Sequence, residues 1–414
     1  MNRQGLDRPL LFTVVALALY GVVVLYSAGQ TDAPTDAAGA WMKQLVWLGL
    51  ALVAAALAFR TSFRLLEWAA PGLYILSLAL LALTLVIGTG AGTAAGTKSW
   101  LSIGGVRLGQ PSELAKLATI LLLARYLGSL REAPSSLRAL IRPCFVAGVP
   151  FMLVIAQKDL GSAIVFIGIL FVMLYWAGVR PFLLLLLASP AISLILAANT
   201  RLWGAWMLVL LVALILGRAF VAEGVATYVV NSAMGVFAIV LWNRVLKPYQ
   251  QQRLVTFLNP ELDPAASGYQ AIQSKVAIGS GGWSGQGLTQ GPQKRLAFLP
   301  EQHTDFIFSV VGEELGFLGV ILALGLFLCL MLILVRIARR ATDPFASLVT
   351  FGVLALFLTH FFENVGMTVN VMPITGIPLP FFSYGGSFLL ACALAVGLAL
   401  RVAWDSRLSG YADM

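Results

Sequence analysis

The sequence predicts an all-α polytopic membrane protein with about twelve transmembrane helices and both termini in the cytoplasm. Of its 414 residues, 59% are hydrophobic and only 11% are charged, whereas a soluble domain carries about 25% charged residues. The mean hydropathy is +0.90, and apolar runs of about 20 residues, the length that crosses a bilayer, recur along the chain. These observations exclude a soluble enzyme, and we expect no nucleic acid partner.

Twelve apolar runs are candidate spans. The first follows Arg3 and Arg8 but is longer than the apolar part of a signal peptide, roughly 7–15 residues, so we expect it to be retained. The spans lie at roughly 10–28, 44–59, 70–88, 112–127, 143–156, 160–178, 181–198, 202–217, 229–243, 305–335, 345–362 and 386–401.

Basic residues set the predicted orientation of these spans. Alternate connections and both ends of the chain carry most of the arginines, and such residues mark the cytoplasmic side. The large 244–303 connection then lies outside. It is amphipathic and rich in glycine, as in IGSGGWSGQGLTQGP, and also carries basic residues. We expect a loop that lies on the membrane surface and meets an anionic, lipid-linked molecule; a merely solvated loop is the alternative.

Several polar clusters fall on the same outer side. In GQPSELAKL, Pro111 suits the first helical position, and Ser112 and Glu113 can satisfy free amides. Glu113 and Lys116 are three residues apart and therefore face the same way. Either they form a local ion pair, or Lys116 faces a cavity and meets phosphate.

Two further clusters interrupt apolar runs. Lys158 and Asp159 in AQKDLGSA indicate either a plain outer turn or discontinuous helices that line a cavity. Three prolines prevent a helix at 373–380, and SYGGS, which includes Ser387, then opens the last span. Its amides could hold an anion, or it could be a structural turn.

The stretch LPEQHTDF precedes the span at 305–335. Thr304 or Asp305 can cap that helix, and the helix dipole favours an acid there by typically 0.3–1 kcal/mol. Capping alone leaves His303, Glu313 and Glu314 unexplained. For Glu313 and Glu314 we expect structural contacts with neighbouring spans.

These motifs together resemble the SEDS family of membrane glycosyltransferases of cell-wall synthesis. The matching segments are GTGAG…KSWLSIGGVRLGQPSELAKL, QKDLGSA, YQQQRLVTFLNPELDPAASGYQAIQSKVAIGSGGWSGQGL, LPEQHTDFIFSVVGEELGFLG and NVMPITGIPLPFFSYGGS. Within the family, IQSKVAIGSGG and LPEQHTDF resemble the elongation branch more than the division branch. One departure is that members normally have ten spans, whereas three apolar runs occur here between about 181 and 243, where one is usual.

The resemblance implies a single SEDS-type domain over 1–414 that polymerises lipid II outside the bacterial cytoplasmic membrane, with 244–303 as its catalytic loop. It also implies a class B penicillin-binding protein as partner. The family's essential aspartate falls on Asp305, our candidate base. Candidates for the diphosphates are the cations Lys116, Arg107, Lys98 and Lys158. Glu113 and Asp159 would orient these cations, His303 and Thr304 would hold the loop or touch sugar, and Ser387 opens the anion-binding turn.

Two other classes of function stay open. A flippase for lipid-linked precursors suits twelve spans and buried ions, although it should have polar clusters facing both sides. A non-catalytic scaffold for a partner synthase would not need Asp305. Neither the three cysteines nor the carboxylates show metal-ligand spacing, and the sequence leaves open whether Mg²⁺ or Mn²⁺ accompanies the diphosphate.

Overall fold

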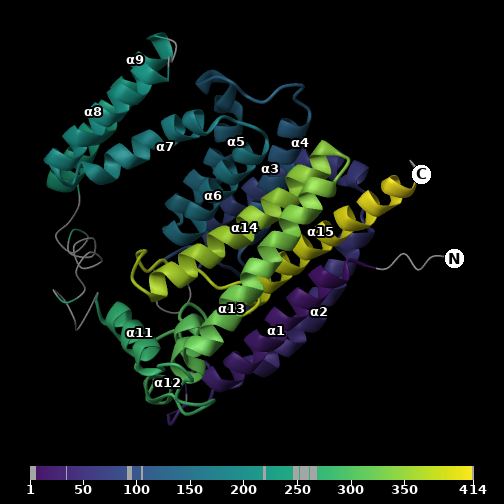
Figure 1. Cartoon of the computed structure of the whole chain (residues 1–414). Helices are drawn as coiled ribbons and strands as arrows, with labels where there is room; N and C mark the ends of the chain where they lie inside the picture. The colour runs from purple at the N-terminus through teal and green to yellow at the C-terminus, as the bar shows by residue number, and fades with distance from the viewer. Residues whose placement is uncertain are drawn as a thin grey trace.

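The chain folds into a bundle of long apolar helices, seen here in a computed structural model (Figure 1). The structure describes residues 6–33, 35–90, 96–103, 106–217, 221–245, 251, 261 and 268–412. Side chains are described for most of these residues, but not for 103–108, which include Arg107. Lys247 and Arg253 of the predicted outer loop lie outside the described residues.

Twelve helices in the described part of the chain match the twelve predicted runs one to one. They are α1 (Arg8–Ala28), α2 (Ala40–Arg60), α3 (Phe63–Ile87), α4 (Pro111–Gly128), α5 (Leu137–Ala156), α6 (Leu160–Trp176), α7 (Pro181–Leu196), α8 (Thr200–Leu216), α9 (Val221–Val240), α13 (Ile307–Arg340), α14 (Pro344–Thr368) and α15 (Gly386–Ala412). Shorter elements are the π-helix η2 (Leu241–Val245), α11 (Tyr269–Ser280) and α12 (Pro292–Arg295).

Eight of the helices in the described residues are long and apolar enough to cross a membrane. Three apolar helices, α6, α7 and α8, are shorter, with 17, 16 and 17 residues. The remaining helix, α4, carries Glu113, Lys116 and Arg125. The chain is therefore a helical multi-pass membrane protein, with eight clear candidate spans and four shorter or more polar helices.

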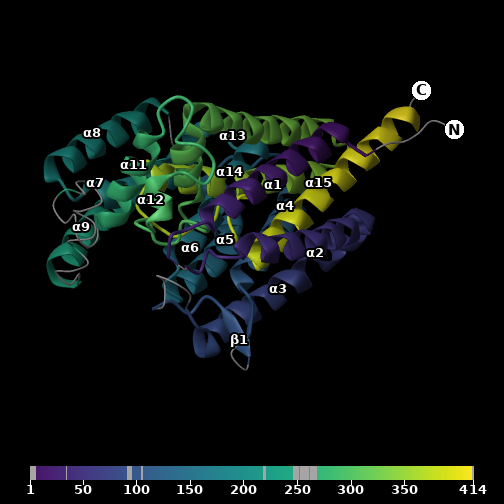
Figure 2. The ribbon, with the colours of Figure 1, turned by 90° about the horizontal axis from the view of Figure 1, so that it is seen from below.

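The start of α1 and the end of α15 lie at the same end of the bundle, and α11 and α12 lie at the opposite end (Figure 1). We call the second end the outer end, after the orientation that the arginine distribution predicts. Helices α4 and α14 are buried along most of their lengths and pack against each other at the centre. Helices α7, α8 and α9 pack mainly against one another and stand to one side of this core (Figures 1 and 2).

A small β-hairpin departs from the all-α expectation. Strands β1 (Leu101–Ile103) and β2 (Val106–Gly109) pair antiparallel, and the hairpin projects beyond α3 (Figure 2). The sequence LSIGGVRLG places apolar residues on both sides of two glycines, the usual pattern of a tight hairpin. The hairpin leads directly into α4, where Pro111 occupies the predicted first helical position.

The predicted span at 305–335 is present as α13, one of the candidate spans, but the helix is broken near its start. Gly316 has φ 61° and ψ −157°, which interrupts the helix between a segment 307–315 and the long apolar remainder. Glycine can adopt this conformation, whereas other residues adopt it only with strain. Glu313 and Glu314 consequently lie in the short segment 307–315, which we call the outer segment, and not in the long apolar remainder.

The predicted caps of two helices are wrong. The residue before α13 is Phe306 and no side chain caps that helix, so neither Thr304 nor Asp305 serves as a cap. Gln110 precedes α4, again without a side-chain cap. Here Glu113 binds Lys116 instead, and the buried Ser112 hydroxyl has no partner.

Candidate active site

Asp305 lies in a turn, residues 300–306, at the outer end of the bundle just before α13. Its backbone N–H donates to the Glu301 carbonyl at 3.1 Å. The Asn364 side-chain amide, from α14, donates to the Asp305 carbonyl at 2.9 Å and to the Ile377 carbonyl at 2.7 Å. One buried asparagine therefore joins the turn to the proline-rich segment 371–385.

The proline-rich segment holds the same turn from another side. The Ser383 hydroxyl donates to the Thr304 carbonyl at 2.5 Å, and the Tyr384 N–H donates to the His303 carbonyl at 2.9 Å. Three successive carbonyls, of residues 303, 304 and 305, are thus fixed by other parts of the chain. Because each bond fixes backbone, the fold sets the direction of the Asp305 Cα–Cβ bond.

The Asp305 carboxyl group is partly buried, and the backbone approaches it closely. A Cβ built on Gly376 would lie 3.1 Å from Asp305 Oδ2, and Gly376 has φ +73°. Burial, followed by the charge of Glu301, raises the pKa of Asp305 from 3.8 to about 7. The side chain is therefore a stronger base than an ordinary aspartate and is still half ionised at neutral pH.

His303 and Thr304 support the turn. Burial lowers the pKa of His303, so its ring is neutral at neutral pH. The His303 and Tyr384 rings lie 6.0 Å apart. The Thr304 hydroxyl donates to the Glu301 carbonyl at 3.2 Å and to Glu301 Oε2 at 3.1 Å. The Thr304 side chain thus binds within the turn and the His303 ring lies near Tyr384, and the expected roles of both residues stay predictions.

Lys116 is fully buried, with 0% of its side chain exposed. Its Nζ lies 2.8 Å from Glu113 Oε1 and 3.1 Å from His360 Nε2. Because an ammonium group only donates, His360 Nε2 accepts, and Nδ1 donates its proton to the Pro378 carbonyl at 3.2 Å. The local ion pair, one of the two alternatives from sequence, is present, and it links α4 and α14 to the proline-rich segment.

Two exposed lysines lie on neighbouring outer loops. The Lys98 N–H donates to the Gln157 carbonyl at 3.0 Å, which joins the segment before β1 to the turn between α5 and α6. The Lys98 ammonium donates to the Leu85 carbonyl at 3.1 Å. Lys158 follows Gln157, is exposed, and has φ 64°. Their side chains are accessible from the outer side, unlike that of Lys116.

Within the described residues Asp159 binds a backbone N–H and a side-chain amide, and its expected role of orienting a cation stays a prediction. Its Oδ1 accepts from the Ser162 N–H at 3.0 Å and caps α6, and its Oδ2 accepts from the Gln110 side chain at 2.8 Å. AQKDLGSA is thus an outer turn between two continuous helices. Asp159 still lies near enough to Asp305 for its charge to contribute to the raised pKa of Asp305.

Ser387 lies in the first turn of α15, where the buried hydroxyl has no hydrogen-bond partner. Gly109, at the end of β2, is next to it, since a Cβ there would lie 3.4 Å from Ser387 Cβ. The hairpin and the SYGGS turn are therefore neighbours. No group of three His, Cys, Asp or Glu residues suited to a metal occurs in the part of the chain that the structure describes.

Backbone strain occurs in the loops at the Asp305 end of the bundle. In the described part of the chain, six residues other than glycine have φ between 53° and 67°: Lys158, Thr289, Ala297, Glu301, Asn370 and Phe381. Such conformations cost about 1–3 kcal/mol each and cluster at functional sites. The strain supports the outer end around Asp305 as the functional site.

The candidate residues from the sequence do not include Asn364, Gly376 or His360. Asn364 stands in HFFENV, where polar residues enter an otherwise apolar helix, and that cluster was the available signal. Gly376 lies between prolines in PITGIP, where only its φ reveals its role. Their contacts join segments far apart in the chain, which no local pattern displays.

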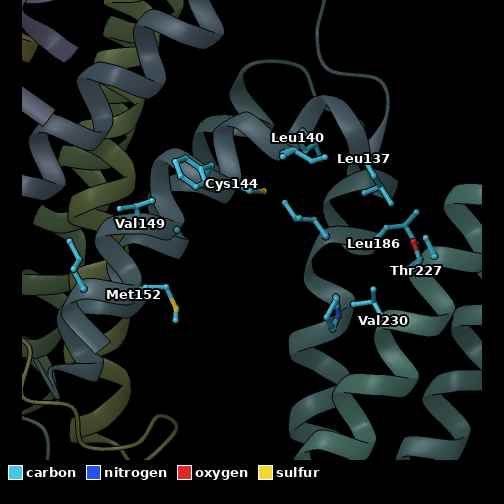
Figure 3. A pocket seen from close by; sticks show the side chains of 15 residues that line it. Leu137, Leu140, Cys144, Val149, Met152, Leu186, Thr227 and Val230 are labelled. Carbon is cyan, nitrogen blue, oxygen red and sulfur yellow. The ribbon is translucent and has the colours of Figure 1, made fainter. Parts of the chain in front are cut away.

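An apolar pocket of about 790 Å³ lies elsewhere, between α5 and the pair α7 and α9 (Figure 3). Its lining is almost wholly aliphatic, as with Leu140, Val149 and Leu186, and it contains none of the predicted site residues. It faces the side of the bundle where the α7–α9 group stands apart. The candidate active site is therefore the polar outer end and not this pocket.

Comparison with known proteins now decides the family. The family model for FtsW, RodA and SpoVE, described as "Cell cycle protein", matches residues 8–207 and 203–408. This chain belongs to the SEDS family. The peptidoglycan glycosyltransferase RodA of Treponema pallidum is 35% identical over 96% of this chain and 97% of its own length. A probable peptidoglycan glycosyltransferase FtsW of Trichlorobacter lovleyi is 37% identical over 97% and 94%.

Solved structures of SEDS proteins have the same fold. A chain from work described as "Structural coordination of polymerization and crosslinking by a peptidoglycan synthase complex" aligns with a TM-score of 0.72 at 30% identity, covering 97% of this chain and 98% of that one. RodA of Thermus thermophilus aligns with a TM-score of 0.62 at 28% identity, over 98% and 99%. The family resemblance seen in the sequence is confirmed, with RodA and FtsW both close.

Proposed function

We propose that this chain is a peptidoglycan glycosyltransferase that polymerises lipid II at the outer face of the bacterial cytoplasmic membrane. Asp305 carries the proposal: a carboxylate fixed at the outer end, with a pKa of about 7. A general base works best when its pKa lies near the operating pH. The elongation branch of the family, which RodA represents, is the branch we propose, on the segments IQSKVAIGSGG and LPEQHTDF.

The proposed reaction is a single displacement with inversion. The Asp305 carboxylate takes the proton from the 4-hydroxyl of an acceptor N-acetylglucosamine. That oxygen forms a bond to C1 of a donor N-acetylmuramic acid, while the bond from C1 to the diphosphate oxygen breaks. Undecaprenyl diphosphate leaves as a stable anion, so a strong general acid is not needed. Attack from the face opposite the leaving group inverts C1, by analogy with inverting glycosidases.

The diphosphate needs positive charge at the outer surface. Lys98 and Lys158 are exposed there and can reach a ligand without rearrangement. Lys116 is occupied by Glu113 and His360, so we give it the role of supporting the proline-rich segment. The amides that open α15 near Ser387 are a second place for an anionic group.

The topology that we propose has twelve spans and two cytoplasmic termini. Even parity keeps the catalytic segment, 244–303 and its continuation to Asp305, outside. A class B penicillin-binding protein is the proposed partner, because a glycan polymerase needs a transpeptidase to cross-link its product. The related synthase complex, which couples polymerization with crosslinking, supports this partnership.

Polymerisation in detergent tests the function. Purified protein with lipid II, in the absence of any sealed membrane or gradient, should produce glycan strands that muramidase digests. A pure flippase would leave lipid II unchanged under these conditions. A scaffold would also leave it unchanged, and the Asp305→Ala variant of a scaffold would still complement a deletion strain.

A further inference from the structure

Asp305 lies within a loop of chain that a buried ion pair closes. Lys294, in α12, and Glu314, in the outer segment of α13, flank the turn on either side in the sequence. The Lys294 Nζ lies 3.0 Å from Glu314 Oε1, and each side chain is only 1% exposed. The chain between them contains the whole of LPEQHTDF.

The rest of the Lys294 ammonium group binds the outer end of α1. Nζ donates to the Ser27 carbonyl at 3.0 Å and to the Gln30 carbonyl at 2.9 Å. Two of the ammonium hydrogens are thus bound by carbonyls, and Glu314 Oε1 lies beside the group as an ion-pair contact. The ion pair is therefore also the point where α1 meets the catalytic segment.

Ser27 connects the same groups a second time. Its hydroxyl donates to Glu314 Oε2 and accepts from the Thr289 N–H at 3.0 Å. One residue further along α1, the Ala28 carbonyl accepts from the Gln302 side chain at 2.9 Å. The catalytic segment is thus bound to the outer end of α1 at Thr289 and Lys294, which precede LPEQHTDF, and at Gln302, which lies within it.

Glu313 binds the backbone of Lys294 and of the residue before it. Its Oε1 accepts from the Gln293 N–H at 2.7 Å, and its Oε2 accepts from the Lys294 N–H at 3.2 Å. Gly291 makes room for this carboxylate, because a Cβ there would lie 2.6 Å from Glu313 Cδ. Of the two adjacent acids, Glu313 therefore binds backbone N–H groups, and Glu314 pairs with the ammonium group.

At the break at Gly316, the glycine-rich residues 282–287 form backbone hydrogen bonds with α13. Where the helix is interrupted, the Glu313 and Glu314 carbonyls accept from the N–H groups of Gln286 and Gly287, both at 3.0 Å. In return, the N–H groups of Phe317 and Leu318 donate to the carbonyls of residues 282 and 283, at 2.9 and 3.1 Å. The backbone groups freed by the break are thereby satisfied.

We propose that Ser27, Lys294, Glu313 and Glu314, which we term the clasp, form a positioning device that fixes Asp305 for glycosyl transfer. This inference rests on the proposed function. Buried ion pairs add little net stability compared with apolar residues of the same size, because both charges lose their hydration. What a buried ion pair provides is a single fixed arrangement of the two residues. Here that arrangement holds together the two ends of the loop that contains Asp305.

A paired substitution tests the clasp. The double variant Lys294→Met, Glu314→Gln removes both charges of the pair together, so neither residue is left as an unpaired buried ion, and Glu313 keeps its two backbone N–H partners. We expect kcat for lipid II polymerisation to fall about 10- to 100-fold, the effect of a small displacement of a catalytic group. KM should stay within about threefold, because the clasp does not contact the substrate.

The control is a second ion pair between the same two helices at their cytoplasmic ends. Arg336 of α13 lies 2.7 Å from Asp7, which precedes α1. The double variant Asp7→Asn, Arg336→Met removes that pair and keeps a residue suited to capping α1. We expect its kcat to remain within about twofold of wild type. An unchanged kcat in the clasp variant, or equal losses in both doubles, would overturn the proposal.

Hydrogen exchange of the wild-type protein tests the clasp even where the variant does not fold. The amides of Thr289, Gln293 and Lys294 should exchange as slowly as those inside α13, and fast exchange would overturn the proposal. Asp305→Asn, measured in parallel, separates the two claims. An active Asp305→Asn would contradict the proposed base, whereas an inactive Asp305→Asn beside a fully active clasp variant would contradict only the clasp.

Discussion

Asp305 differs from a surface aspartate in the number of groups that fix its backbone. Asn364, Ser383 and Tyr384 hold three successive carbonyls of the turn, and Gly376 crowds the carboxyl group itself. Burial makes the carboxyl group basic, and the turn keeps it in place. Fixed direction together with a pKa near neutrality is what a general base requires.

The raised pKa of Asp305 predicts a specific pH dependence. The base acts in its ionised form, so kcat/KM should rise about tenfold per pH unit below pH 7 and level off above it. An ordinary aspartate, with a pKa near 3.8, would leave the rate flat from pH 5 upward. Initial polymerisation rates between pH 5 and 9 measure this, and a flat profile would contradict the assigned pKa of about 7.

The sequence predicts the candidate site residues better than it predicts the residues that contact them. The motif LPEQHTDF identifies Asp305, and the spacing of Glu113 and Lys116 predicts that they face the same way. It does not predict that His360, from a helix far along the chain, completes the Lys116 environment. Spacing reports neighbours on one helix, whereas contacts between helices depend on how the helices pack.

The helix α13, which follows Asp305 directly, is broken at Gly316. The run 305–335 is apolar enough to be taken for one continuous span, and Gly316 alone does not reveal the break. The structural reason is that residues 282–287 supply hydrogen bonds to the groups that the break frees. Because those residues lie in a different segment, only the folded chain shows that Glu313 and Glu314 lie before a break in the helix.

Replacing Gly316 should therefore be costly. Gly316→Ala places a side chain at φ 61° against the backbone of Gly285, and we expect a loss of about 1–3 kcal/mol of stability. Gly325→Ala, further along α13, is the matched control, since its Cβ meets open space. That change should be neutral or stabilise by about 0.5–1 kcal/mol. Thermal unfolding in detergent compares the two, and equal stabilities would contradict the break.

The whole molecule divides into a central bundle and a peripheral group, α7–α9. The twelve helices were predicted by hydropathy, and their boundaries moved by several residues where helices continue past the apolar runs, as α3 does to its cap at Ser62. Hydropathy cannot decide whether the short helices cross. At 1.5 Å per residue, α7 and α8 measure about 25 Å, slightly less than the roughly 30 Å of a bilayer core.

Labelling of single cysteines tests the twelve-span arrangement. Between α7 and α8, Ala198→Cys should react with an impermeant maleimide added to intact spheroplasts, because that connection would lie outside. Between α6 and α7, Arg180→Cys should react only after permeabilisation. The unsubstituted protein, with Cys144, Cys329 and Cys392, is the background control. Protection of both new cysteines in intact spheroplasts would show that α7 and α8 do not cross as a pair.

We propose that Asp305 is the base of a glycan polymerase. The most direct test compares wild type with Asp305→Asn in detergent, with equal amounts of folded protein shown by matching unfolding temperatures. Loss of a general base typically lowers the rate by about 10²–10⁴-fold. We expect the variant to bind lipid II normally and to produce glycan at least about 100-fold more slowly. Glycan formation at the wild-type rate would contradict the claim.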